Sequence, residues 1–158
     1  MARWGSVHDA LMVSKDVMKK PGVVAGGGSS EVETASQVRK WAENLTGREQ
    51  LAAQEFAEAL ETIPIALAVN AGLSPIDTMT EIRAKHASGG KWYGVEAKEG
   101  KVKDMYKENV LEPLSVKEQM IKSATAAACM ILRIDDVISA GKSKGPSGPP
   151  AGGGGEFD

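Results

Sequence analysis

Apolar residues recur three and four positions apart along most of the chain, which is the spacing of one face of an α-helix. Val7, Leu11 and Met18 fall on such a face, and a Pro-Gly pair follows where that helix should stop. The spacing predicts helices over residues 6–19, 30–45, 48–71, 75–87 and 116–132. Pro64 should kink or restart the third of these, because proline lacks a backbone N–H and clashes with the preceding turn.

The β-forming residues are confined to short segments. Residues 92–96 and 101–105 carry β-forming side chains on either side of a glycine-containing turn, so we expect one small β-hairpin. Val23–Ala25 should be a short extended link, and residues 109–114 a loop, since Pro113 keeps the residue before it out of the α region. The predicted fold class is therefore mainly α, multihelical, with one small β-hairpin.

Three consecutive glycines, Gly26, Gly27 and Gly28, separate the first two predicted helices. Glycine tolerates a positive φ and lets another group approach the backbone closely. Ser30 and Glu33 have the capping-box spacing, which predicts a helix N-terminus directly after the glycines. The free N–H groups and the dipole of that helix would favour an anion or another polar ligand. A plain connector between two helices is the other interpretation of this run.

Composition and charge narrow the possible functions. With 158 residues, 42% hydrophobic and 25% charged, the chain is ordinary for one globular domain. A net charge of −2 gives no general reason to bind nucleic acid or an anionic membrane, and 4% aromatic content offers no base-stacking platform. Nothing resembles a signal peptide, and no apolar run approaches the ~20 residues of a membrane span. We therefore expect no nucleic-acid and no membrane partner.

Individual residues add little by themselves. The single cysteine, Cys129, cannot form an internal disulfide, which fits a reducing, cytoplasmic compartment. His8 and His86 are too isolated for a metal site, so no metal ligands are predicted. Residues 142–158 are loaded with glycine and proline and lack apolar periodicity, which predicts a disordered tail.

Several motifs taken in order carry a resemblance. They are His8-Asp9-Ala10-Leu11, Val23-Val24-Ala25-Gly26-Gly27-Gly28, Asn70-Ala71-Gly72-Leu73, Glu112-Pro113 and Ile134-Asp135-Asp136. The chain resembles the C-terminal part of the equatorial domain of group II chaperonins, the archaeal thermosome and its eukaryotic cytosolic relatives. The resemblance covers residues 6–141, and residues 1–5 look like a truncated or replaced boundary. It implies an ATP-driven folding machine of stacked rings, with other chaperonin subunits and unfolded client proteins as partners.

The resemblance also implies roles for individual residues. Asp9 matches the catalytic aspartate that orients or deprotonates the water attacking the γ-phosphate. Gly27 matches the glycine whose backbone lies against ribose and base, with Gly26 and Gly28 supporting the turn. Glu112 matches an acidic position that accepts hydrogen bonds from ribose hydroxyls. The hairpin matches a segment that borders the adenine, which implies Glu96 and Ala97 as neighbours of the base. The implied cofactor is ATP or ADP.

The departures from the family pattern matter as much. The phosphate-binding Gly-Asp-Gly-Thr-Thr motif, whose aspartate holds Mg²⁺, is absent from this sequence. Losing it removes most of the charge neutralisation that phosphoryl transfer needs, so we expect weak or no ATPase activity from the chain alone. Mg²⁺ is expected only with the missing N-terminal half, and client proteins only with domains absent here. The alternative function is a stand-alone helical interaction or assembly module without nucleotide chemistry.

Overall fold

The computed structural model of the chain describes residues 2–135, so the predicted tail lies outside the described residues. Contacts divide the chain into two compact units, residues 1–122 and 123–158. The first contains all the described strands, helices α1 to α4 and the first turns of α5, and the second continues α5 to Leu132. The elements are α1 (Ala2–Lys19), β1 (Val23–Ala25), α2 (Ser29–Ala42), α3 (Gly47–Asn70), α4 (Pro75–Ala87), β2 (Tyr93–Glu96), β3 (Lys101–Asp104), β4 (Leu111–Pro113) and α5 (Leu114–Leu132).

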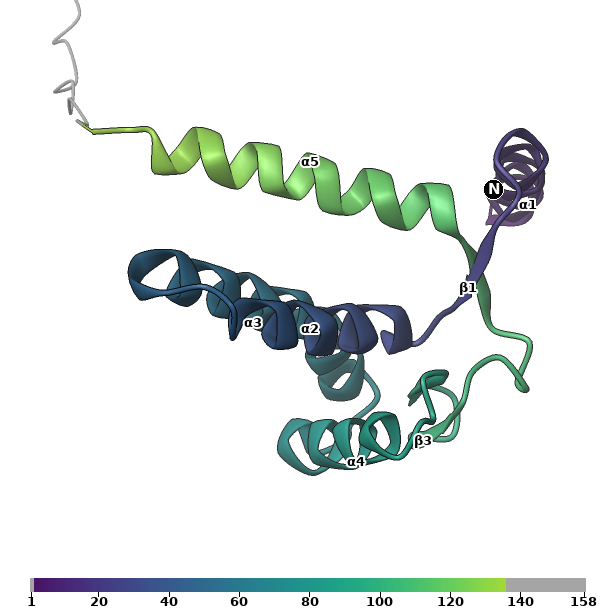
Figure 1. Cartoon of the computed structure of the whole chain (residues 1–158). Helices are drawn as coiled ribbons and strands as arrows, with labels where there is room; N and C mark the ends of the chain where they lie inside the picture. The colour runs from purple at the N-terminus through teal and green to yellow at the C-terminus, as the bar shows by residue number, and fades with distance from the viewer. Residues whose placement is uncertain (1, 136–158) are drawn as a thin grey trace, which may run out of the picture. The chain divides into compact units, whose positions relative to one another are not determined.

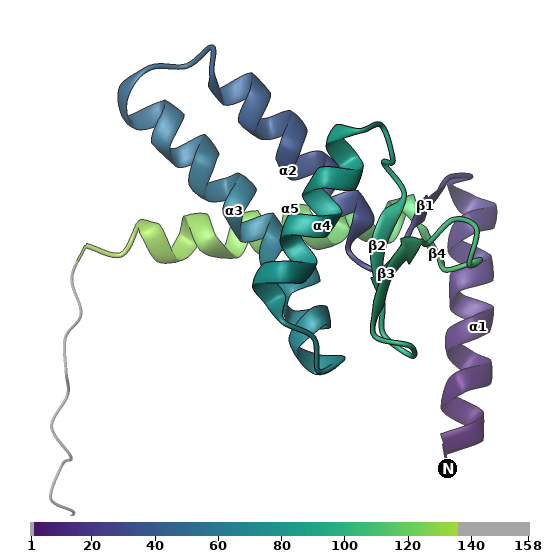
Figure 2. The same cartoon turned by 90° about the horizontal axis from the view of Figure 1, so that it is seen from below.

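The core lies where α2, α3 and α4 pack together with the hairpin. Helices α2 and α3 run side by side, and α4 packs against α3 and against the β2–β3 hairpin (Figures 1 and 2). Small and medium side chains fill two clusters, which allows the helices to approach closely. The first cluster is Val32, Ala68, Met79, Ile82 and Val95, and the second is Ala35, Ala57 and Leu60.

The buried face of α3 follows the apolar spacing only in part. Leu51, Phe56 and Leu60 are predicted on one apolar face, yet only Leu60 is buried, and Leu51 and Phe56 are 61% and 37% exposed. The residues that are buried include Glu61 and Pro64, a charged residue and a proline that apolar spacing does not select. The helix also runs without interruption from Gly47 to Asn70, so it does not restart at Pro64. The Pro64 ring packs instead against the backbone of Gly28, where its bulk fills space beside the glycine turn.

The strands form two separate antiparallel pairs. The predicted hairpin is confirmed as β2 and β3, with Tyr93 opposite Asp104 and Glu96 opposite Lys101. A second pair joins β1 to β4, with Val24 opposite Glu112. The segment expected as a loop, residues 109–114, is therefore partly a strand. Three-residue strands carry no recognisable alternation, which is why the sequence did not indicate this pair.

Helix α2 begins one residue earlier than predicted and without a capping box. Its N-cap is Gly28, in the left-handed region with φ 77°, and no side chain caps the helix. Ser29 Oγ donates a hydrogen bond to the carbonyl oxygen of Ala25 at 3.0 Å. Glu33 turns away from the helix end, since its carboxylate accepts from Gln37 Nε2 at 3.0 Å. The glycine turn and the strand before it thus shape this helix start.

Helix α1 presents large apolar side chains to solvent. Val7, Leu11 and Met18 are 54%, 65% and 84% exposed, so one face of this helix is apolar and open to solvent. In the part of the chain that the structure describes, no helix combines the length and apolar character needed to cross a membrane.

Candidate functional site

The glycine turn is held by backbone hydrogen bonds from two directions. The N–H of Gly26 donates to the Val110 carbonyl oxygen at 2.9 Å, just before β4. The N–H of Val95 in β2 donates to the Gly27 carbonyl oxygen at 2.8 Å. Gly27 and Gly28 both have positive φ, 64° and 77°, which side chains rarely allow. The turn therefore joins the start of α2 to both strand pairs.

Close packing around the turn leaves no room for side chains. A Cβ added at Gly27 would lie 2.7 Å from the Val95 carbonyl oxygen, and one at Gly28 would lie 2.6 Å from Pro64 Cβ. Gly94 contributes from the opposite side, since a Cβ there would lie 2.7 Å from the Gly27 carbonyl oxygen. The protein's own packing thus requires these glycines, whatever they bind. Gly94 did not figure among the predicted site residues, although a glycine inside a strand is a signal of close backbone approach.

Glu112 lies beside the first glycine of the turn. Its carboxylate is 37% exposed, and a Cβ added at Gly26 would lie 2.8 Å from Glu112 Oε1. The pairing of β4 with β1 brings this about, because it sets Glu112 opposite Val24, two residues before Gly26. The structure therefore brings together four predicted site residues that are far apart in sequence, Glu112 and the three glycines.

A lysine that the sequence did not single out joins this carboxylate to a buried one. Lys117, in the first turns of α5, places Nζ 2.7 Å from Glu112 Oε2 and 2.5 Å from Glu31 Oε1. Glu31 is 2% exposed, and its other oxygen accepts from Ser30 Oγ at 2.8 Å. Burial lowers the pKa of Lys117, but the hydrogen bonds to Glu112 and Glu31 raise it by more than burial lowers it. The pKa of Lys117 is therefore above its usual value. Lys117 is therefore a cation shared by two carboxylates.

The two hairpin residues predicted near the adenine occupy the hairpin turn. Glu96 ends β2, and its two carboxylate oxygens accept the backbone N–H groups of Lys98 at 3.0 Å and Glu99 at 2.6 Å. Ala97 follows and is exposed. Glu96 consequently has a structural task in closing the hairpin, independent of any ligand.

Asp9 is placed differently from the other predicted residues. It lies in α1 with an exposed side chain, and α1 contacts β4, the strand that carries Glu112. Within residues 2–135, no hydrogen bond or ion pair joins Asp9 to the glycine turn. The hollow beside α2 and the start of α5, about 220 Å³, is lined by Glu31 and Lys117 among others, and not by Asp9. The structure thus groups Glu112 with the turn and leaves Asp9 as a separate exposed carboxylate.

A second charged cluster ties the three core helices together. Glu61 of α3 is 1% exposed and accepts from the two terminal guanidinium nitrogens of Arg39 in α2, each at 2.6 Å. Arg83 of α4 donates to the same carboxylate, with Nε 3.1 Å from Oε1. Burial raises the pKa of Glu61, but the hydrogen bonds from Arg39 and Arg83 lower it more, so the net pKa falls below its usual value. This cluster supports the scaffold on which the glycine turn is built.

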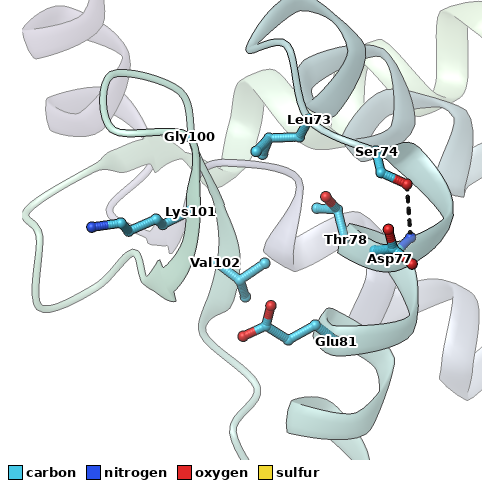
Figure 3. Close-up of a pocket in the computed structure, with 8 residues that line it drawn as sticks. All are labelled: Leu73, Ser74, Asp77, Thr78, Glu81, Gly100, Lys101 and Val102. Carbon is cyan, nitrogen blue, oxygen red and sulfur yellow. Dashed lines mark hydrogen bonds between the residues drawn. The ribbon is translucent and has the colours of Figure 1, made fainter.

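Another hollow lies between α4 and the hairpin, with a volume of about 430 Å³. Figure 3 shows Val102 and Glu81 facing each other across it, while the Lys101 side chain points away. The hydroxyl of Ser74 is already engaged, since it accepts the Asp77 N–H at 3.4 Å as the cap of α4. None of the predicted site residues lines this hollow. In residues 2–135 no three His, Cys, Asp or Glu side chains are grouped as metal ligands.

The fold identifies a class of protein. Its five helices and small antiparallel strands within residues 2–135 match a fragment of a chaperonin equatorial domain. The chain belongs to the TCP-1/cpn60 chaperonin family, whose sequence model matches residues 3–142.

Within that family, the relatives are group II chaperonin subunits, as the resemblance implies. The thermosome subunit alpha of Archaeoglobus fulgidus is 53% identical over 150 residues, which is 93% of this chain and 28% of that protein. The thermosome subunit of Methanocaldococcus jannaschii is 52% identical over 141 residues, 89% of this chain and 26% of that protein. An open-state monomer of a group II chaperonin from Methanococcoides burtonii superimposes with a TM-score of 0.77 at 51% identity, covering 82% of this chain and 32% of that one.

The chain thus spans about 28% of the length of the first curated relative, and corresponds to a part of a chaperonin subunit. The mainly α class and the chaperonin resemblance are both confirmed. The expected segment boundaries, residues 1–5, 6–141 and 142–158, stay predictions, as do the roles of the individual site residues.

Proposed function

We propose that this chain supplies the nucleoside-side and water-activating half of an ATP site in a group II chaperonin ring. The observation that carries the proposal is the meeting of Glu112 with the glycine turn, two features far apart in sequence that β1–β4 pairing brings into contact. In its full context the chain would join other chaperonin subunits in the cytoplasm. Unfolded client proteins would bind domains outside this chain.

The residues at the turn fit a ribose. Glu112 offers a partly exposed carboxylate, and hydroxyl groups that donate to a carboxylate form strong, charge-assisted hydrogen bonds. Oε2 is held by Lys117, and Oε1 is the oxygen that lies beside Gly26. The ribose hydroxyls would thus meet a carboxylate whose orientation the protein has already fixed.

Asp9 is the proposed carboxylate for the attacking water. Phosphoryl transfer depends on a positioned water and on neutralisation of the phosphate charge, and an aspartate can orient or deprotonate that water. The sequence carries no Gly-Asp-Gly-Thr-Thr motif to hold the phosphates and Mg²⁺. We therefore expect nucleoside binding without appreciable ATP turnover by the chain itself. ATP hydrolysis at the rate of an intact chaperonin would contradict this part of the proposal.

Nuclear magnetic resonance can test the nucleoside half directly. Adenosine, titrated to millimolar concentration into the ¹⁵N-labelled chain, should shift the amide signals of Gly26–Gly28 and Val95. Glu112→Gln should weaken adenosine binding by about tenfold, the value of one hydrogen bond to a charged group. Glu118→Gln is a matched control, because Glu118 is also 37% exposed and also pairs with a lysine. Absence of shifts at the turn, or equal loss in both variants, would refute the proposal.

The helical assembly module is the second candidate, and the exposed apolar residues of α1 favour it. Val7, Leu11 and Met18 form an uncovered face of the kind that drives association. Analytical ultracentrifugation together with the titration separates the two functions. A defined oligomer that Leu11→Glu dissociates, without adenosine binding, would support assembly alone, whereas adenosine binding that Glu112→Gln weakens supports the ATP site.

A further inference from the structure

We propose that Lys117 is a positioning residue for Glu112, holding its carboxylate against the glycine turn with buried Glu31 as the anchor. The inference rests on the proposed function, since it takes Glu112 as the ribose acceptor. It adds a residue from the first turns of α5 to a site that otherwise comprises the glycine turn, the hairpin and β4.

The geometry gives each member of the triad one task. Glu31 is 2% exposed and stands in the first turn of α2, so its position is fixed by the helix and by the hydrogen bond from Ser30 Oγ. Lys117 is itself largely buried, with 12% of its side chain exposed, and places one ammonium between the two carboxylates at 2.5 and 2.7 Å. Glu112 is the exposed member, at 37%. Glu31 is thus the fixed anchor, Lys117 is the cation that links the two carboxylates, and Glu112 is the group that solvent and ligand can reach.

The two carboxylate oxygens of Glu112 have different neighbours, which supports a role for Lys117 in orienting this carboxylate and not only in neutralising its charge. Lys117 takes Oε2, which leaves Oε1 as the oxygen beside Gly26. A partly exposed glutamate in the middle of a three-residue strand would otherwise sample several rotamers. Held by Lys117, Glu112 presents Oε1 in one direction. Loss of Lys117 should therefore reduce the selectivity for ribose hydroxyls more than the affinity for the base.

The competing explanation is that Lys117 only balances the buried charge of Glu31. A structural role of this kind would lower the binding of all nucleosides equally when Lys117 is removed. The two explanations predict different ratios of affinity between adenosine and its 2′-deoxy and 3′-deoxy forms. One of these analogues lacks the hydroxyl that would donate to Glu112, so its affinity relative to adenosine reports on that single hydrogen bond. That ratio is the readout that a purely structural role leaves unchanged.

The experiment measures dissociation constants for adenosine, 2′-deoxyadenosine and 3′-deoxyadenosine by amide titration of the full chain. The unaltered chain should prefer adenosine over at least one deoxy form by about tenfold. Lys117→Met should bring this preference close to onefold, and Lys117→Arg, which keeps a cation, should retain most of it. Lys20→Met is the matched control, because Lys20 also lies 2.5 Å from a glutamate oxygen, on Glu118, and should leave the preference unchanged.

The outcomes separate the two proposals. If the unaltered chain discriminates and Lys117→Met still does so fully, the positioning role is wrong while the ATP-site proposal stands. If the unaltered chain binds no adenosine or shows no preference, the proposed function fails and the inference fails with it. If Lys117→Met unfolds, the double variant Glu31→Gln/Lys117→Met replaces the buried ion pair by uncharged side chains, and a retained preference in that variant overturns the inference.

Discussion

Removing the charge of Glu61 should weaken the core that supports the glycine turn. The carboxylate is buried and accepts four N–H contacts from Arg39 and Arg83, which reach it from α2 and α4. Glu61→Gln keeps the shape, but its amide oxygen can accept only the two N–H groups that one carboxylate oxygen accepts now, and its NH2 donor faces the other two. Two hydrogen bonds to a charged group are therefore lost, at roughly 1.5–2 kcal/mol each. The two arginine side chains are 36% and 53% exposed, so water recovers part of that loss. We expect about 2–3 kcal/mol of destabilisation, or about 5–10 °C in the melting temperature.

Urea denaturation followed by far-ultraviolet circular dichroism measures this change at neutral pH. Glu55→Gln is the control, since Glu55 lies on the same helix and is exposed, and it should stay within about 0.5 kcal/mol of the unaltered chain. The pH dependence gives a second test. The Glu61 pKa in the folded chain lies below its ordinary value of 4.5, so the carboxylate stabilises the fold above that pH and ceases to do so as the pH falls through the folded-state pKa. The difference between the two chains should therefore shrink in acid. A Glu61→Gln variant as stable as the unaltered chain at pH 7, or a difference that persists unchanged in acid, would refute the reasoning.

Two further predictions concern the surroundings of the turn. Gly27→Ala should cost about 2 kcal/mol more than Gly47→Ala in urea denaturation, because both residues have φ +64° but only the Cβ at Gly27 would clash with neighbouring atoms; equal losses would show that backbone strain alone decides. His86→Phe should destabilise the chain by about 2–3 kcal/mol and speed hydrogen exchange of the hairpin amides, because it removes both imidazole contacts, to Glu33 Oε2 at 2.9 Å and to the Tyr93 carbonyl oxygen at 2.8 Å. Unchanged exchange in the hairpin would contradict that role for His86.

The helices were predictable because their signals are local. Apolar spacing, together with Pro75 at the start of α4 and Gly72 after α3, indicated each helix within a few residues of its observed bounds. The hairpin was predictable for the same reason, since its two strands flank one short turn. Which face of a helix is buried is not local, and the burial of Glu61 in α3 depends on arginines contributed by two other helices.

The site was predictable in part. The contacts that the sequence did not predict all join residues that are far apart in the chain. The glycines and Glu112 were indicated by motif, but their contact depends on β1–β4 pairing. Strands of three residues are too short for the sequence pattern to predict that pairing. Lys117 and Glu31 are 86 residues apart, and their ion pair leaves no pattern in either segment. The packing of Pro64 against Gly28 is likewise a contact made only in the folded chain.

The β1–β4 pair has a consequence for the order in which the molecule assembles. Helices α2 and α3 and the β2–β3 hairpin join segments close in sequence, whereas β1 must wait for β4, and closing so long a loop is entropically slow. During synthesis the helical core can form while residues 111–117 are still inside the ribosome. A nascent chain at that stage holds a glycine turn without its acidic partner, and acquires the complete arrangement only when β4 docks.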